Sequence, residues 1–166
     1  MGFLSSIFGS RGTPKPAPSQ SVDTAAGKAD GEALADELFP FAEQMLREHQ
    51  EFFPFGGSMK PNGEIVHEGA HTGSDQPPSQ DLIDLLRKAH QKAAADQKIR
   101  ACAIVYDIRT VPPGRSEKQD AIALAVDHHG GYSAVIIFPY SFTADGELAI
   151  EAPFAVKGDR EIFPAN

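Results

Sequence analysis

The spacing of hydrophobic residues along the chain predicts two helices and about six strands. Between Glu32 and His49 the hydrophobic residues recur on one helical face, and Pro40 is expected to kink or divide this helix. A second helix is expected to begin at Ser79, which can cap it, and to end near Asp96. Apolar runs between turn residues predict strands over 52–59, 64–70, 99–110, 120–128, 132–140 and 148–156.

The order of these elements, α-ββ-α-βββ, predicts an α+β fold. Tight turns such as 61–63 and 145–146 join neighbouring strands, so we expect an antiparallel sheet of about five to six strands. Two helices should pack on this sheet and cover one face of it, and Ile162 and Phe163 should pin the C-terminal end. The element order is similar to that of profilin-like and roadblock-like domains, which are mostly binding modules.

Residues 1–31 are predicted to form a flexible tail, and residues 32–166 a single α+β domain. Near the start, hydrophobic residues share one face of a short helix, and glycine and proline residues then interrupt regular structure. The four residues on that face are candidate binding residues: Phe3, Leu4, Ile7 and Phe8. They would dock in a partner's groove or make peripheral contact with a membrane. The alternatives are that the segment folds back on its own domain or stays disordered.

Residues 67–71 spell His-Glu-Gly-Ala-His, the letters of a zinc-protease motif. That motif needs a helix, because only the helical pitch brings two histidines four positions apart onto one face. Here the preceding Asn62-Gly63 turn and the internal Gly69 favour a strand, on which positions 67 and 71 lie about 13 Å apart. We therefore expect surface histidines. The alternative is a metal site at His67 and His71 with Glu68 as general base.

Asp107 and Arg109 are the polar residues of interest in the longest predicted strand, 99–110. They share one face and would pair with each other or mark a polar pocket, which makes them candidate binding residues. The competing interpretation is a strand end that emerges into solvent. The single cysteine, Cys102, lies in an apolar run of the same strand and is expected to be a small buried residue.

Composition narrows the classes of function. The formal net charge of −8 disfavours binding to a phosphate backbone, so no nucleic-acid partner is expected. One cysteine rules out an intramolecular disulfide, and no apolar run approaches the ~20 residues needed to cross a bilayer. We expect a cytoplasmic protein without a cofactor.

Four segments in the middle of the chain carry a resemblance to known sequences. FFPFGGSM, EIVHEGA, PPSQDLIDLL and AIVYDIRTVPPG resemble small bacterial proteins of uncharacterised function, over residues 48–140. The resemblance implies a bacterial α+β protein and no particular activity. The sequence therefore favours a non-catalytic interaction module, such as an adaptor or immunity-type protein that binds a partner protein. The alternatives are a metal-dependent hydrolase using residues 67–71 and a membrane-peripheral protein docked through residues 3–8.

Overall fold

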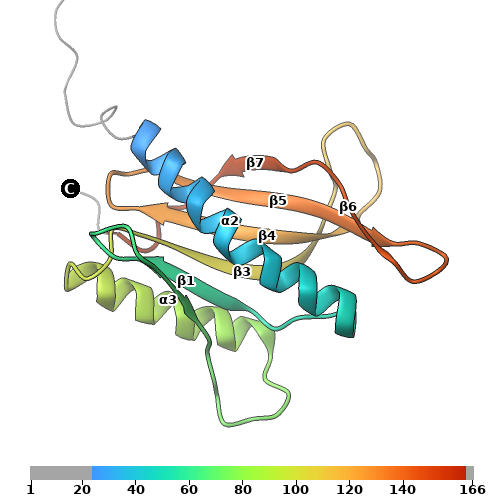
Figure 1. Cartoon of the computed structure of the whole chain (residues 1–166), viewed down its shortest axis with the longest axis horizontal. Helices are drawn as coiled ribbons and strands as arrows, with labels where there is room; N and C mark the ends of the chain where they lie inside the picture. Colours follow the sequence, from blue (N-terminus) through green and yellow to red (C-terminus); the bar gives the residue numbers. More distant parts are fainter. Residues whose placement is uncertain (1–23, 164–166) are drawn as a thin grey trace, which may run out of the picture.

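The computed structural model describes residues 24–163 and confirms the predicted α+β class (Figure 1). The candidate binding residues Phe3, Leu4, Ile7 and Phe8 lie outside the described residues. The elements, in chain order, are α2 (Thr24–His49), β1 (Phe55–Met59), β2 (Ile65–Glu68), α3 (Ser79–Ala95), β3 (Ala101–Thr110), β4 (Gln119–His128), β5 (Ser133–Phe142), β6 (Leu148–Ile150) and β7 (Phe154–Lys157).

The sheet has seven antiparallel strands in the order β2-β1-β3-β4-β5-β6, and β7 also pairs with β5. The extra strand arises because the predicted last strand, 148–156, is divided. Its two parts, β6 and β7, follow one another along the same edge of β5. The register shifts by one residue between the pair Tyr140–Ile150 and the pair Ile137–Phe154, at the segment that contains Pro153. Proline has no N–H to donate to the ladder, so the interruption falls where pairing is weakest.

The two helices lie on opposite faces of the sheet, so the prediction that they would cover one face is wrong. A β-carbon on Gly57 would lie 2.7 Å from the Leu38 side chain of α2, whereas one on the adjacent Gly56 would lie 3.2 Å from the His90 ring of α3. Successive residues of a strand point to opposite faces, so α2 and α3 sandwich β1 between them. All five residues of β1 are buried, which explains why this strand needs cover on both sides. We call the two sides the α2 face and the α3 face.

Helix α2 begins at Thr24, not at Glu32, so residues 24–31 belong to the domain and not to the predicted tail. Both glycines of this segment are buried. A β-carbon on Gly27 would lie 2.3 Å from Cβ of Tyr132, and one on Gly31 would lie 3.1 Å from Val126. The glycines, which in sequence look like linker residues, allow the helix backbone to approach the sheet closely. The helix also continues through Pro40 without being divided.

Each face of the sheet has its own hydrophobic core. On the α2 face, fully buried helix residues such as Leu34, Leu38 and Leu46 pack on alternate residues of β3 and β4, among them Ile122, Leu124 and Val126. Burying one such side chain contributes roughly 1.5–3 kcal/mol. On the α3 face a smaller cluster joins Ala94, Ile99, Cys102 and Ile162. No helix within residues 24–163 has the length and apolar character to span a membrane.

Candidate functional site

The three residues of the zinc-protease motif, His67, Glu68 and His71, do not converge on one site. His67 and Glu68 lie on the β1–β2 hairpin, as predicted, and as adjacent residues of β2 they face opposite sides of the sheet. Nε2 of His67 lies 3.2 Å from Glu37 Oε1 of α2, while Glu68 Oε1 lies 2.6 Å from Nε2 of His90 in α3. His71 follows the strand, and its Nδ1 accepts the N–H of Gly73 at 2.7 Å. Within residues 24–163, no group of three or more His, Cys, Asp or Glu side chains is arranged to hold a metal ion.

Glu68 instead forms a polar cluster under α3 with His90 and Ser58. The Ser58 hydroxyl donates to Glu68 Oε2 at 3.0 Å, and His90 is only 1% exposed. Burial alone would raise the pKa of Glu68, but the hydrogen bonds from His90 and Ser58 and the His90 charge outweigh it and lower that pKa. The carboxylate stands between the serine and the histidine, so the histidine cannot take a proton from Ser58 as a catalytic base does. Nδ1 of His90 is buried and has no hydrogen-bond partner among the described residues.

A second buried histidine, His128, belongs to a more complete cluster under α2. Asp30 accepts two hydrogen bonds from Arg100, at 3.0 and 2.9 Å, and lies 2.9 Å from Nε2 of His128. Nδ1 of His128 accepts the Gly130 N–H at 3.0 Å, so a neutral imidazole carries its proton on Nε2 and donates it to Asp30. Burial alone would raise the pKa of Asp30, but the hydrogen bonds and charges of Arg100 and His128 outweigh it and lower that pKa. This cluster fastens the start of α2 to the sheet.

Asp107 and Arg109, the predicted polar pair, have different partners. The Tyr140 hydroxyl donates to the Asp107 carboxylate at 2.9 Å, and Arg109 lies 3.6 Å from Asp120 in a more exposed ion pair. Burial and the Asp120 charge raise the pKa of Asp107, against the hydrogen bond from Tyr140. Burial and the Asp107 carboxylate raise the pKa of Tyr140. The bond from Tyr140 ties β3 to β5 and the Arg109–Asp120 pair ties β3 to β4, so both residues have a structural role and their binding role stays a prediction.

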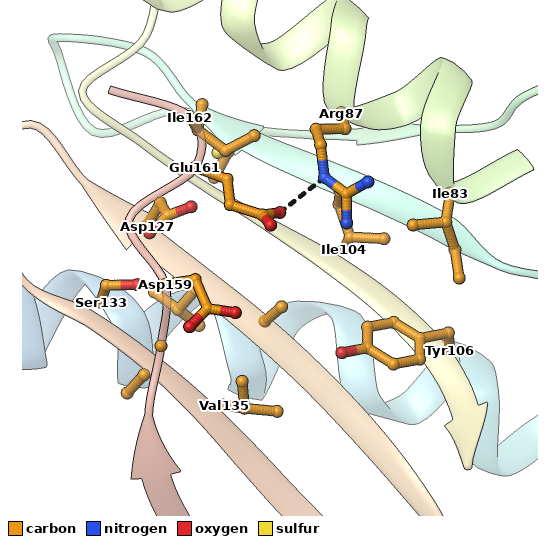
Figure 2. A pocket seen from close by; sticks show the side chains of 15 residues that line it. Ile83, Arg87, Ile104, Tyr106, Asp127, Ser133, Val135, Asp159, Glu161 and Ile162 are labelled. Carbon is orange, nitrogen blue, oxygen red and sulfur yellow. Dashed lines mark ion pairs between the residues drawn. The ribbon is translucent and has the colours of Figure 1, made fainter. Parts of the chain in front are cut away.

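The α3 face contains a small cavity beside the C-terminal segment (Figure 2). Its volume is about 110 Å³, and its lining includes Tyr106, Ser133, Asp127 and Glu161. Glu161 points toward Arg87 of α3, and their charged atoms lie 2.6 Å apart. Burial and the Glu161 charge raise the pKa of Asp127, against hydrogen bonds from Ser133 and the backbone of Glu161 and Ile162. The C-terminal segment therefore closes this face with the chain's own residues.

The α2 face keeps an open groove between the first half of α2 and the strands β5 and β7. We call it the α2–β7 groove, and Figure 1 shows this part of α2 crossing β5 near β7. It has a volume of about 370 Å³, and its lining is mainly apolar with charged residues on the helix side: Lys28, Glu32, Ala35, Asp36, Tyr132, Ile136, Phe138, Pro153, Phe154 and Ala155. Phe39 stacks on Phe138 with ring centroids 4.3 Å apart, which holds one floor residue in place.

Two other hollows at the surface are weaker candidates for a binding site. In the hollow next to Glu68, His71 and His90, these three polar side chains already have partners in the chain. The hollow beside Arg100, His129 and Phe163 adjoins residues 164–166, which lie outside the described residues. The α2–β7 groove differs from both hollows because it is apolar and lies along a strand, β7, at the edge of the sheet.

Comparisons of the chain with protein-family models, with curated proteins and with solved structures found no match. The resemblance to small bacterial proteins stays a prediction, and any function has to be argued from the geometry of this chain.

The sequence analysis missed the groove because its walls are far apart in the chain. Glu32 and Asp36 are ordinary exposed residues of a helix, and Ile136 and Phe138 belong to the apolar strand predicted over 132–140. One signal was available: all five residues of 134–138 are apolar, although β5 lies near an edge of the sheet. Such a strand needs a cover, and α2 supplies it only in part.

Proposed function

We propose that the protein is a non-catalytic interaction module of the cytoplasm that binds a segment of a partner protein in the α2–β7 groove. The observation that carries the proposal is the groove itself, an open apolar channel between a helix and a strand at the sheet edge. Apolar side chains of a bound segment would displace water from Ile136 and Phe138, and this burial favours binding by roughly 25 cal/mol per Å² of apolar surface. Glu32 and Asp36 on the helix side favour a segment that also carries basic residues.

The edge of the sheet supports an extended ligand. Within the described residues, β7 pairs with β5 alone, so its other edge keeps backbone groups that a partner strand can pair with. Addition of a strand supplies affinity through main-chain hydrogen bonds, and alternate side chains then supply specificity. The partner we expect is an extended segment with apolar and basic residues.

Two adjacent exposed residues of β7 make a matched test. Ala155 is paired with the groove residue Ile136, whereas Val156 is paired with Val135, which lines the cavity on the other face. A photo-crosslinking amino acid at position 155 should capture a defined partner in cells of the source organism, and the same group at 156 should not.

An excess of wild-type protein without the crosslinking amino acid should suppress the crosslink, and an excess of Ala155→Arg protein should not. Equal capture from positions 155 and 156, or suppression by both competitors, would refute binding in the groove.

A further inference from the structure

The N-terminal segment of this same chain has the chemistry of the proposed groove ligand. We infer that residues 3–8 dock in the α2–β7 groove of their own domain and compete there with the partner segment. The inference rests on the proposed function for the importance of the groove, and it adds a form of regulation to it. Three observations support it: the position where the chain enters the domain, its charge, and its hydrophobic residues.

The chain enters the domain next to the groove. The described part begins at Thr24, the first residue of α2, and Lys28 on the following turn already lines the groove. The groove wall continues along the helix to Asp36, roughly 18 Å from Thr24 at 1.5 Å per residue. Residues 9–23 can span up to about 50 Å when extended, so Phe8 can reach any point of the groove.

The chain that follows residues 3–8 carries charges opposite to those that predominate on the groove wall. Residues 1–23 carry Arg11 and Lys15 against a single acidic residue, Asp23, while the protein as a whole has a net charge of −8. The helix side of the groove carries two exposed carboxylates, Glu32 and Asp36, and one exposed lysine, Lys28. Basic residues that follow the docked segment would therefore lie in an acidic environment close to the helix.

The hydrophobic residues of the segment fit an apolar channel. Phe3, Leu4, Ile7 and Phe8 are four large hydrophobic residues in a short stretch, and the groove presents Tyr132, Ile136 and Phe138. Because the segment is tethered, its effective concentration at the groove is on the order of millimolar. A weak intrinsic affinity is therefore enough to fill the groove, and a partner must displace the segment before it binds.

Spin-label NMR on the full chain tests the docking directly. A nitroxide is attached at Ser5→Cys, and Cys102, which is 1% exposed, does not react. We expect the amide signals of Lys28, Ile136 and Ala155 to lose intensity, and the signal of Lys92 on α3 to keep it. Ala155→Arg should restore the lost intensity by filling the groove, whereas Val156→Arg should not.

Several results would overturn the inference. Equal intensity loss over both faces, or loss that Ala155→Arg leaves unchanged, would show that the segment is not in the groove. A mixing experiment separates contact within one chain from contact between two copies. Isotope-labelled protein without a nitroxide is mixed with nitroxide-carrying Ser5→Cys protein that has no isotope label, and loss of signal intensity in this mixture would assign the contact to a second copy. Full intensity at the groove together with binding to phosphatidylglycerol vesicles would assign the segment to a membrane. None of these results bears on whether a partner is crosslinked from position 155. Binding of a partner in the groove and docking of residues 3–8 there can therefore be refuted independently.

Discussion

The two faces of the sheet next to β5 are covered in different ways: the C-terminal segment covers one face, and the other keeps an open groove. On the α3 face a helix of 17 residues covers β1 and β3, and the C-terminal segment covers what remains next to it. On the α2 face a helix of 26 residues crosses the sheet and leaves an apolar groove beside β5 and β7.

The buried polar groups differ in the same way. Under α2, both ring nitrogens of His128 have partners, and Asp30 is shared with Arg100. Under α3, His90 Nδ1 and Asp127 Oδ1 are buried without a hydrogen-bond partner among the described residues. The fully paired cluster holds α2 rigidly beside the groove, as a preformed binding surface requires. The cavity on the α3 face is small, and the C-terminal segment forms part of its wall.

The largest loss of stability should follow removal of the carboxylate under α2. Asp30→Ala leaves Arg100 and His128 without their shared acceptor, and we expect the free energy of unfolding in urea to fall by about 3 kcal/mol. The control is Asp36→Ala, an exposed residue of the same helix, which should change it by less than about 0.5 kcal/mol. A loss below about 1 kcal/mol for Asp30→Ala would mean that the cluster does not fasten α2.

A smaller loss should follow loosening of the C-terminal segment on the α3 face. Ile162 is 6% exposed and packs on Ala94, Ile99 and Cys102, so Ile162→Ala should cost about 2 kcal/mol. The same change should uncover the Cys102 thiol, whose pKa burial raises well above its usual value, and so speed its reaction with a thiol reagent. The exposed Val156→Ala is the control, and equal thiol reactivity in both variants would contradict the idea that the segment closes this face.

Replacing each buried histidine by leucine compares the two clusters directly. His128→Leu removes an acceptor of the Gly130 N–H and a donor to Asp30, and should cost about 2 kcal/mol. His90→Leu removes a nitrogen that has no hydrogen-bond partner, which offsets part of the loss. Glu68 keeps its hydrogen bond from Ser58 and is one third exposed to water, so the free energy of unfolding should fall by less than about 1 kcal/mol. Equal losses for the two variants would show that the unpaired nitrogen of His90 does not matter.

Two partly buried aspartates, Asp30 and Asp127, should respond to pH with opposite sign. The pKa of Asp30 is lowered in the folded state, so its ionised form contributes stability above the unfolded value near 3.8, and that stability is lost on acidification. The pKa of Asp127 is raised, so stability present below 3.8 is lost as the pH rises through the folded value. Relative to wild type, Asp30→Asn should therefore become less stable from pH 3 to 7, and Asp127→Asn more stable, in urea titrations at each pH. Parallel trends in the two variants would contradict this assignment.

Much of the fold could be predicted because it is local. The alternation of Ile122, Leu124 and Val126 with alanines fixes which side of β4 meets the core, and the Asn62-Gly63 turn fixes the hairpin that separates His67 from Glu68. The start of α2 was missed because Gly27 and Gly31 resemble linker residues until Tyr132 and Val126 are known to lie against them.

The site depends on contacts between residues that are far apart in the chain, and no local pattern contains them. Asp30 and Arg100 meet only because α2 crosses the sheet, and Glu68 meets His90 only because α3 lies under the hairpin. The helical spacing of His90 with Leu82 and Leu86 puts His90 on the apolar face of its helix, and a buried histidine needs a partner, which was a signal for this contact. The groove could not be predicted from a sequence pattern, because it is the space left between a helix and two strands after they pack.

The most direct measurement of the central claim is the affinity of the crosslinked partner, once purified, for two variants of β7. Ala155→Arg fills the α2–β7 groove, and Val156→Arg places the same charge and bulk on the adjacent exposed residue of the opposite face. Calorimetry should show at least about a tenfold weaker Kd for Ala155→Arg, which corresponds to ~1.4 kcal/mol, and a Kd for Val156→Arg within about twofold of wild type. Equal affinities for the two variants would contradict binding in the groove.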